Sequence, residues 1–286
     1  MSGLSPRAVA ALEAVAGIAL LSVMDALIKG VAARVPVLEI AFARYLFGSL
    51  AIGVIWILAR PGRPSWETVR ANGLRALLVV VTATSFFYAL STLPLAETLA
   101  LSFLSPIFVA LFASALLKER VEPRVLAALA AGFVGMAVIV GGKLGSGTFQ
   151  GVSLGVAAVL LSAVTYGLSM VQLRARAQQD PVVTIVLIQN LGPGLVLVGP
   201  AAWVWTAPAA SDWALLALIG GLGVAGHLLM ARAYAKAEAA RLASLEYTAL
   251  LWAVLLGYAA YGEIPTAATL GGAALIVGGA LLASRR

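Results

Sequence analysis

Two ionisable residues stand inside the first long apolar run of this chain, and their spacing suggests their chemistry. Asp25 and Lys29 lie four residues apart within residues 8–31, so a helix would place them on one face. They can form an ion pair near the helix end, with Lys29 reaching towards the water interface. Alternatively, Asp25 can face a cavity and bind a substrate ammonium group or a proton.

Arg44 lies early in the second apolar run, residues 37–59. Its guanidinium group can hold a substrate carboxylate through two parallel hydrogen bonds. It can also join its helix to a neighbouring one through Glu39, Asp25 or Glu97. We favour the structural ion-pair role for both Arg44 and Lys29, because charged side chains in apolar spans are costly unless they are paired.

His227 and Glu246 are further polar candidates in the second half of the chain. The imidazole of His227 can relay protons or bond a substrate, although a lone histidine is more often a satisfied polar group. Glu246 can take a substrate ammonium group, or it can pair with Arg232 or Arg241.

Hydroxyl and aromatic side chains could line a cavity for flat substrates. The run of residues 160–165 parallels residues 20–25, so Thr165 occupies the position that Asp25 holds in the other half. Pro106 removes one backbone hydrogen bond and can kink its helix. Packing between helices and anchoring at the membrane interface remain the alternatives for these side chains. The candidate cavity residues are Asp25, Tyr88, Ser102, Thr165, Tyr166, His227, Glu246, Tyr247 and Trp252.

Several classes of chemistry have no support in the sequence. The chain has no cysteine and one histidine, so we expect no disulfide, no thiolate nucleophile and no metal site. The pattern His-Glu-x-x-His, a nucleophile elbow and a phosphate-binding glycine loop are all missing. No cofactor is expected, and an intramembrane enzyme or an ion channel is a weaker hypothesis than a transporter.

The composition places the chain in a lipid bilayer. Apolar residues make up 62% and charged residues 11%, whereas soluble domains have roughly 45–50% and about 25%. The net charge of +7 is distributed in short groups between apolar runs. That distribution is typical of a membrane protein oriented by its Lys and Arg residues, so no nucleic-acid partner is expected.

The sequence predicts an all-α integral membrane protein with ten spans, because each span needs about 20 apolar residues. With the N-terminus in the cytoplasm, fifteen Lys and Arg residues fall on the cytoplasmic side and three on the other. This bias predicts that both termini are cytoplasmic. The predicted spans are residues 8–31, 37–59, 73–92, 95–117, 124–142, 151–173, 182–204, 212–234, 240–261 and 265–284.

The chain contains an internal repeat. Residues 89–135 can be laid over residues 233–279 without a gap, and Glu119 then falls on Glu263. The repeat unit has five spans, an odd number, so the second copy must enter the membrane upside down. We therefore divide the chain into residues 1–143 and 144–286, which is the plan of a transporter with inverted repeats around a central site.

Two of the predicted spans carry small residues at four-residue spacing and almost no polar side chains. Examples are Ala131 with Gly135 in residues 124–142 and Ala274 with Gly278 in residues 265–284. This spacing permits close helix packing. We assign these spans to packing or to a homodimer face.

The segments Leu104-Ser105-Pro106-Ile107 to Leu117-Lys118-Glu119-Arg120 and Ala41-Phe42-Ala43-Arg44 resemble the EamA-type module of the drug/metabolite transporter superfamily. The second copy departs from this pattern, since Leu250 stands where Pro106 would repeat. The resemblance implies ten helices and export or exchange of small metabolites in a bacterial cytoplasmic membrane. The chain looks most like bacterial amino-acid exporters, including those for aromatic amino acids. Exporters of other metabolites or drugs are the alternative.

Overall fold

The computed structural model describes residues 6–117, 123–144, 149–176, 179–236 and 248–284. These residues form eleven helices and no strand. The helices are α1 (Pro6–Val31), α2 (Val37–Ala59), α3 (Trp66–Thr92), α4 (Leu95–Ser102), α5 (Ser105–Leu117), α6 (Pro123–Leu144), α7 (Phe149–Arg176), α8 (Val182–Trp203), α9 (Ala210–Lys236), α11 (Thr248–Tyr261) and α12 (Ala267–Ser284).

The helices follow the predicted spans closely, with two differences. Helix α3 begins at Trp66, seven residues before the predicted start, because Ser65 caps its first turn by accepting a hydrogen bond of 3.1 Å from the Thr68 backbone N–H. The predicted span 95–117 consists of two helices, α4 and α5. Residues 237–247 of the ninth predicted span lie outside the described residues.

The break between α4 and α5 lies at Phe103 and Leu104. The backbone tightens there, since the Leu104 N–H bonds the Leu101 carbonyl at 3.2 Å. Pro106 in the first turn of α5 has no N–H, so the Ser102 carbonyl lacks its usual helical donor. A discontinuous helix of this kind is tolerated in a membrane where the freed groups are buried in protein or face a wet cavity.

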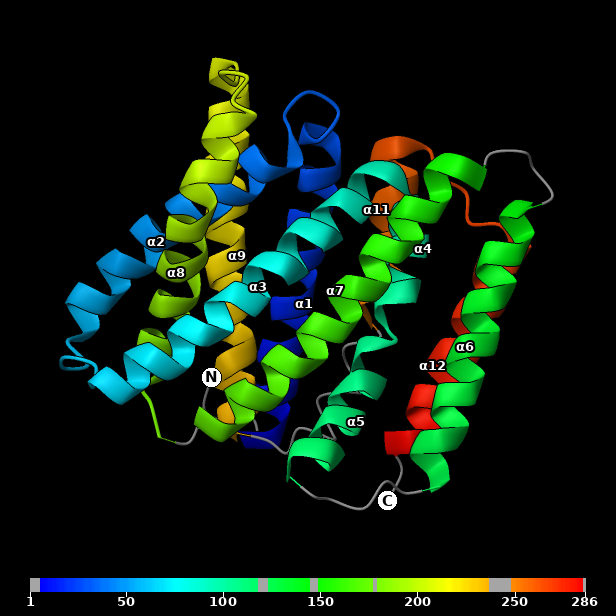
Figure 1. The fold of residues 1–286 in the computed structure, drawn as a ribbon, viewed down its shortest axis with the longest axis horizontal. Helices are drawn as coiled ribbons and strands as arrows, with labels where there is room; N and C mark the ends of the chain where they lie inside the picture. The colour runs from blue at the N-terminus through cyan, green and yellow to red at the C-terminus, as the bar shows by residue number, and fades with distance from the viewer. Residues whose placement is uncertain (1–5, 118–122, 145–148, 177–178, 237–247, 285–286) are drawn as a thin grey trace.

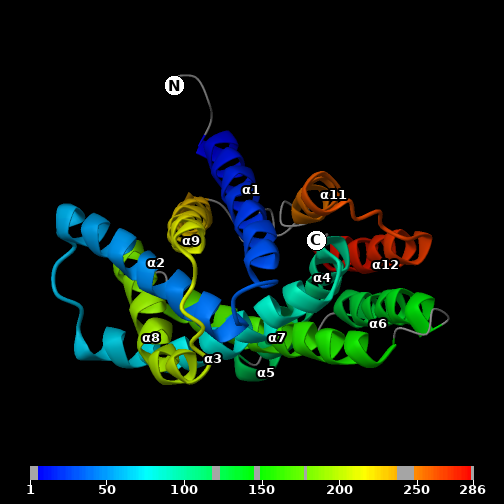
Figure 2. The same cartoon turned by 90° about the horizontal axis from the view of Figure 1, so that it is seen from above.

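The helix contacts of the bundle are reproduced when each helix is replaced by its counterpart in the other five-helix repeat. Helix α1 packs against α9, and their counterparts α7 and α3 also pack together. In the same way, the contact between α2 and α9 corresponds to the contact between α8 and α3. In the contacts α2–α8 and α6–α12, each helix packs against its own counterpart. Figures 1 and 2 show α2 and α8 at one end of the molecule, α6 and α12 at the other, and the remaining pairs between them.

Opposite faces of the bundle can be named by ion pairs at the two ends of α1 and α9. Glu13 near the start of α1 pairs with Arg232 near the end of α9, whereas Arg34 after α1 pairs with Asp212 at the start of α9. The two helices are therefore antiparallel. We call the side of Arg34 the Arg34 face and the opposite side, which also carries Arg176 at the end of α7, the Arg176 face. Helix α1 begins and α12 ends towards the same edge in Figure 1.

The outer surface is strongly apolar. Leu58, Leu195 and Ile264 are each more than 70% exposed, and six helices among the described residues are long and apolar enough to cross a membrane. Helices satisfy their own backbone groups, so an apolar outer surface on such helices suits lipid. The chain is a multi-pass membrane protein.

Helices α6 and α12 use their small residues for packing within the chain. A Cβ added to Gly135 would lie 2.5 Å from the backbone oxygen of Gly272, and one added to Gly132 would lie 2.7 Å from Leu104. Gly278 of α12 meets no atom within 4 Å in the described part of the chain. Gly135 and Gly132 therefore serve the contacts of α6 with α12 and with α5 inside the chain. The homodimer face remains a prediction.

We expect Gly135→Ala to lower the thermal stability of the purified protein, since its methyl group would push α12 away. Overpacking of this kind costs about 1–3 kcal/mol. Gly278→Ala is the matched control, because it adds the same methyl group to open space. Melting temperatures in detergent would test the pair, and equal values for both variants would contradict the packing role of Gly135.

Candidate functional site

Arg44 lies buried where α2, α8 and α9 meet, with only 5% of the residue exposed. Its Nη1 donates a long hydrogen bond of 3.5 Å to Asn190 Oδ1 on α8. A Cβ at Gly223 on α9 would lie 3.0 Å from Arg44 Nη2, so only glycine leaves the guanidinium this space. Its Nε is buried and has no hydrogen-bond partner among the described residues. The structure thus holds Arg44 mainly by packing and leaves part of its donor set free.

Two of the predicted site residues lie beside Arg44. Asp25 on α1 is buried and interacts electrostatically with the guanidinium group. His227 on α9, one turn beyond Gly223, places Nδ1 2.6 Å from the Gly223 carbonyl and also lies within electrostatic reach of Arg44. The ring of Tyr45 lies 4.2 Å from Arg44 Cζ, a cation–π distance. Helices from both halves therefore bring Asp25, Arg44 and His227 together.

Arg75 on α3 forms a second buried guanidinium site, and Tyr45 and His227 each interact electrostatically with both arginines. Its Nε donates to Ser169 on α7 at 3.1 Å, and its Nη2 donates to Gln189 on α8 at 3.2 Å. Gln189 precedes Asn190, so two adjacent amides of α8 accept hydrogen bonds from two arginines. Tyr166, another predicted site residue, interacts electrostatically with Arg75.

The other predicted cavity residues are distributed over several helices. Thr165 Oγ1 bonds Thr82 Oγ1 at 2.7 Å between α7 and α3, and Ser102 donates to the Leu99 carbonyl at 2.8 Å within α4. Tyr88 is 39% exposed and Trp252 is half-buried. Glu246 and Tyr247 lie outside the described residues.

Lys29 has a different ion-pair partner from the one that its spacing suggested. Its Nζ lies 3.0 Å from Glu263 Oε1 and donates to the Leu93 carbonyl at 2.6 Å. Glu263 Oε2 accepts from the Leu95 N–H at 2.8 Å. The tertiary structure therefore pairs Lys29 with Glu263, which follows α11, rather than with Asp25 of its own helix. The end of α3 and the start of α4 bring a backbone acceptor and a backbone donor to the same place.

An ion pair joins the halves on each face, and the two pairs are related by the repeat. On the Arg34 face, Arg34 lies 2.7 Å from Asp212 at the start of α9. On the Arg176 face, Arg176 lies 2.6 Å from Glu67 at the start of α3, the counterpart of α9. Arg176 also contacts Asp180 at 3.2 Å. We call the ion pair of Arg34 with Asp212 the Arg34 latch, and the ion pairs of Arg176 with Glu67 and Asp180 the Arg176 latch.

The Asp180 carboxylate is the best satisfied group of the Arg176 latch. Burial raises its pKa, but hydrogen bonds from Thr68, Arg176 and Asn72, together with the Arg176 charge, outweigh burial and hold the pKa below its ordinary value. A depressed carboxyl pKa means that the stabilisation is present at neutral pH. It is lost only as the pH falls through the depressed value.

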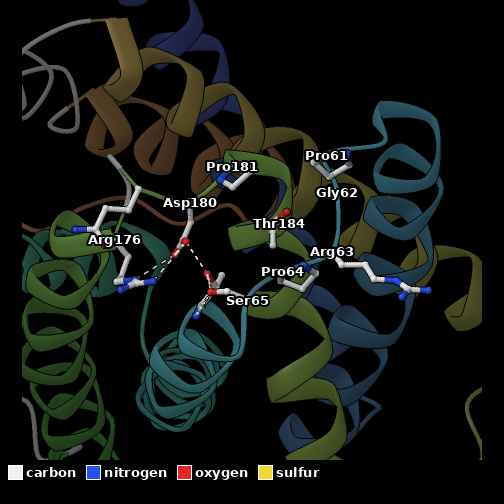
Figure 3. Close-up of a pocket in the computed structure, with 11 residues that line it drawn as sticks. Pro61, Gly62, Arg63, Pro64, Ser65, Arg176, Asp180, Pro181 and Thr184 are labelled. Carbon is white, nitrogen blue, oxygen red and sulfur yellow. Dashed lines mark hydrogen bonds and ion pairs between the residues drawn. The ribbon is translucent and has the colours of Figure 1, made fainter.

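A pocket of about 330 Å³ opens beside this latch, between the α2–α3 connection and the turn into α8. Figure 3 shows Arg176 and Asp180 pointing towards each other at its edge, whereas the Arg63 side chain points away from them. Its lining residues are Pro61, Gly62, Arg63, Pro64, Ser65, Thr68, Arg176, Gln179, Asp180, Pro181 and Thr184. The pocket lies at the surface of the Arg176 face, and neither Arg44 nor Arg75 is among its lining residues. Among the described residues, no group of three or more His, Asp or Glu residues is placed to hold a metal ion.

The sequence matches one transporter family twice. The EamA-like transporter family matches residues 8–141 and again residues 153–285. The chain belongs to this family. In this EamA-like transporter, the two matched segments contain the helices that are counterparts in the packing described above. The sequence repeat and the packing repeat therefore agree.

Known relatives of this EamA-like transporter move different solutes. It is 31% identical to the pseudopaline exporter CntI of Pseudomonas aeruginosa over 92% of each chain. It is 24% identical to the S-adenosylmethionine uptake transporter of Rickettsia bellii, over 90% of this chain and 86% of that one. The riboflavin transporter of Brucella anthropi is 27% identical, over 90% and 91%. One solved crystal structure superposes with a TM-score of 0.68 at 26% identity, over 96% of each chain.

Sequence reasoning missed three residues of the buried cluster, namely Arg75, Gln189 and Asn190. Arg75 is one of the fifteen Lys and Arg residues that the sequence assigns to the cytoplasmic side, and the structure buries it inside α3, only 4% exposed. Because α3 begins at Trp66, after the Ser65 cap, Arg75 lies more than two turns inside the helix. Adjacent amides within the apolar residues 182–204 were a visible signal, because uncharged polar groups inside a span need partners.

Proposed function

We propose that this EamA-like transporter exports small organic metabolites, with amino acids, aromatic ones included, as the first candidates. It would do so by alternating access through a central cavity between its inverted halves. The observation that carries the proposal is the buried group of Asp25, Arg44 and His227, which helices of both halves hold at their junction. Ionisable groups inside a membrane protein mark substrate or ion paths by default.

The relatives support transport of a small solute across a bacterial membrane. These relatives are a pseudopaline exporter, an S-adenosylmethionine uptake transporter and a riboflavin transporter. We favour export because this chain resembles amino-acid exporters. Export of other metabolites or drugs is the alternative. We place the protein in the inner membrane with both termini in the cytoplasm, and we keep residues 1–143 and 144–286 as its two repeats.

A flux measurement tests the proposal directly. Proteoliposomes that contain the purified chain would be loaded with labelled amino acids, and protein-dependent efflux would be measured against empty liposomes. We expect efflux of at least one amino acid. If no amino acid moves but another metabolite does, the alternative substrate class holds. If no solute of either class moves, the proposed function is contradicted.

We expect Thr165→Trp to abolish this efflux without loss of expression. Thr165 bonds Thr82 between α7 and α3, so an indole there would fill the adjoining part of the predicted cavity and block movement of the two helices. Thr84→Trp is the matched control, because the Thr84 hydroxyl bonds the Val80 carbonyl of its own helix. Normal efflux in Thr165→Trp would remove Thr165 from the path.

A further inference from the structure

We propose that the substrate carries an anionic group, a carboxylate by preference, which binds between Arg44 and Arg75. This inference rests on the proposed function, since it names the chemical class that the transporter accepts. We call the group of Arg44, Arg75, Gln189 and Asn190 the arginine site.

The first argument is the nature of the partners that the protein gives to these arginines. In the described part of the chain, the hydrogen bonds of Arg44 and Arg75 go to Asn190, Ser169 and Gln189, all of which are neutral. By contrast, Arg34, Arg176 and Arg232 each form an ion pair with a carboxylate of the protein. Buried charges are costly when no opposite charge offsets them. Within the described residues, the arginine site therefore has no carboxylate bonded directly to a guanidinium group, and an anionic ligand would supply one.

The second argument is the free edge of Arg44. Within the part of the chain that the structure describes, Arg44 Nε is buried without a hydrogen-bond partner, and the bond from Nη1 to Asn190 is long at 3.5 Å. A guanidinium edge that combines Nε and Nη matches the two oxygens of a carboxylate. A Cβ at Gly223 would lie 3.2 Å from Nε and 3.1 Å from Met24 Sδ, so only a glycine at this position leaves any room beside the edge.

The third argument is the balance of charge. Asp25 interacts electrostatically with Arg44, whereas Arg75 interacts with Tyr166 and Tyr45. His227 lies within electrostatic reach of both arginines and adds no negative charge. An anionic solute would offset the remaining positive charge, whereas a purely cationic solute would add to it. A zwitterion satisfies the site best, because its ammonium group can use Asp25.

The backbone of α8 supports a binding role at the same level. Pro193 has no N–H, so the carbonyl of Gln189 lacks its usual helical donor. The residue whose side chain holds Arg75 therefore also has a backbone acceptor without its helical partner. Such positions occur in transporters where irregular backbone lines a substrate site.

Matched solutes test the proposed substrate class. Proteoliposomes with the full chain would be loaded with a mixture of amino acids, the corresponding amino-acid amides and the corresponding decarboxylated amines, together with sugar phosphates. Mass spectrometry would follow their protein-dependent efflux. We expect carboxylates to leave at least about ten-fold faster than their amides and amines, since each lost charge-assisted contact is worth about one such factor. Phosphate-bearing solutes moving in place of carboxylates would keep the anionic class and change the preferred group.

Efflux of amides or amines at the rate of their carboxylates would overturn the inference and leave the proposed function intact. Absence of efflux for every solute would instead contradict the proposed function. These two failures are therefore distinguishable in one experiment.

Arg44→Gln and Arg75→Gln test the residues themselves. We expect each variant to lose discrimination between a carboxylate and its amide by about ten-fold, with a melting temperature close to that of the parent chain. Arg176→Gln is the control, since Arg176 pairs with carboxylates of the protein and its loss should leave discrimination unchanged. Arg75→Lys keeps the charge in case the neutral variant does not fold. Unchanged discrimination in the folded arginine-site variants would overturn the assignment.

Discussion

Replacing Glu263 with alanine is expected to cause the largest loss of stability in this protein. Lys29 Nζ would keep its backbone acceptors at Leu90 and Leu93 but would lose the Glu263 carboxylate, 3.0 Å away. The Leu95 N–H at the start of α4 would lose its acceptor as well. Lys29 and Glu263 are mostly buried, with 15% and 20% of their side chains exposed, so an uncompensated cation there costs about 3 kcal/mol.

Thermal unfolding in detergent would measure this effect, and a double substitution provides the control. We expect Lys29→Met combined with Glu263→Ala to be less destabilising than the sum of the two single changes, because the double variant leaves no unpaired charge. Additive losses would show that the pair has no mutual interaction. The Tyr261 hydroxyl, which donates to the Ala26 carbonyl, would still join α11 to α1 in all variants.

Breaking the two latches is expected to shift the transporter towards opposite open states. Arg176→Ala removes the link from α7 to Glu67 and Asp180 on the Arg176 face. Asp212→Ala removes the link to Arg34 on the Arg34 face. Because each link contributes to one closed face, its loss should favour the state in which that face is open. The two variants should therefore differ in sign, not merely in size.

A single introduced cysteine makes this measurable, since the chain has none. Ser22 is buried on α1, one turn before Asp25, so Ser22→Cys reports access to the cluster from either side. We expect an impermeant thiol reagent to label it faster from the Arg176 face in Arg176→Ala and faster from the Arg34 face in Asp212→Ala. Arg70→Ala removes an exposed charge from the same helix as Glu67 and should change neither rate. Equal changes from both faces would contradict the latch assignment.

Local hydrophobicity explains why the spans were predictable. A run of about 20 apolar residues must form a helix in lipid, since its backbone groups have no other partners there. Residues 37–59 match α2 at both ends, and residues 182–204 match α8 within one residue. The resemblance to EamA-type transporters and the presence of two repeats are confirmed by the family matches to both halves.

The local sequence did not show which charged side chains pair with one another. Sequence spacing placed Lys29 beside Asp25, but the structure pairs Lys29 with Glu263, more than two hundred residues away. Arg75 lies at the start of the predicted span 73–92, but α3 begins at Trp66, after the Ser65 cap, so Arg75 is buried inside the helix. Its contacts with Ser169 and Gln189 come from two other helices.

The sequence by itself determined that this chain crosses a membrane in two related sets of helices, because transfer of apolar segments into lipid depends on each segment alone. Only the tertiary structure decided which charges meet. Antiparallel packing of α1 with α9 and of α3 with α7 brings residues from both halves to one level of the bundle. That packing leaves Arg44 and Arg75 on neutral amides while it gives Arg34 and Arg176 carboxylates. This difference arises from helix–helix geometry, which no single segment contains.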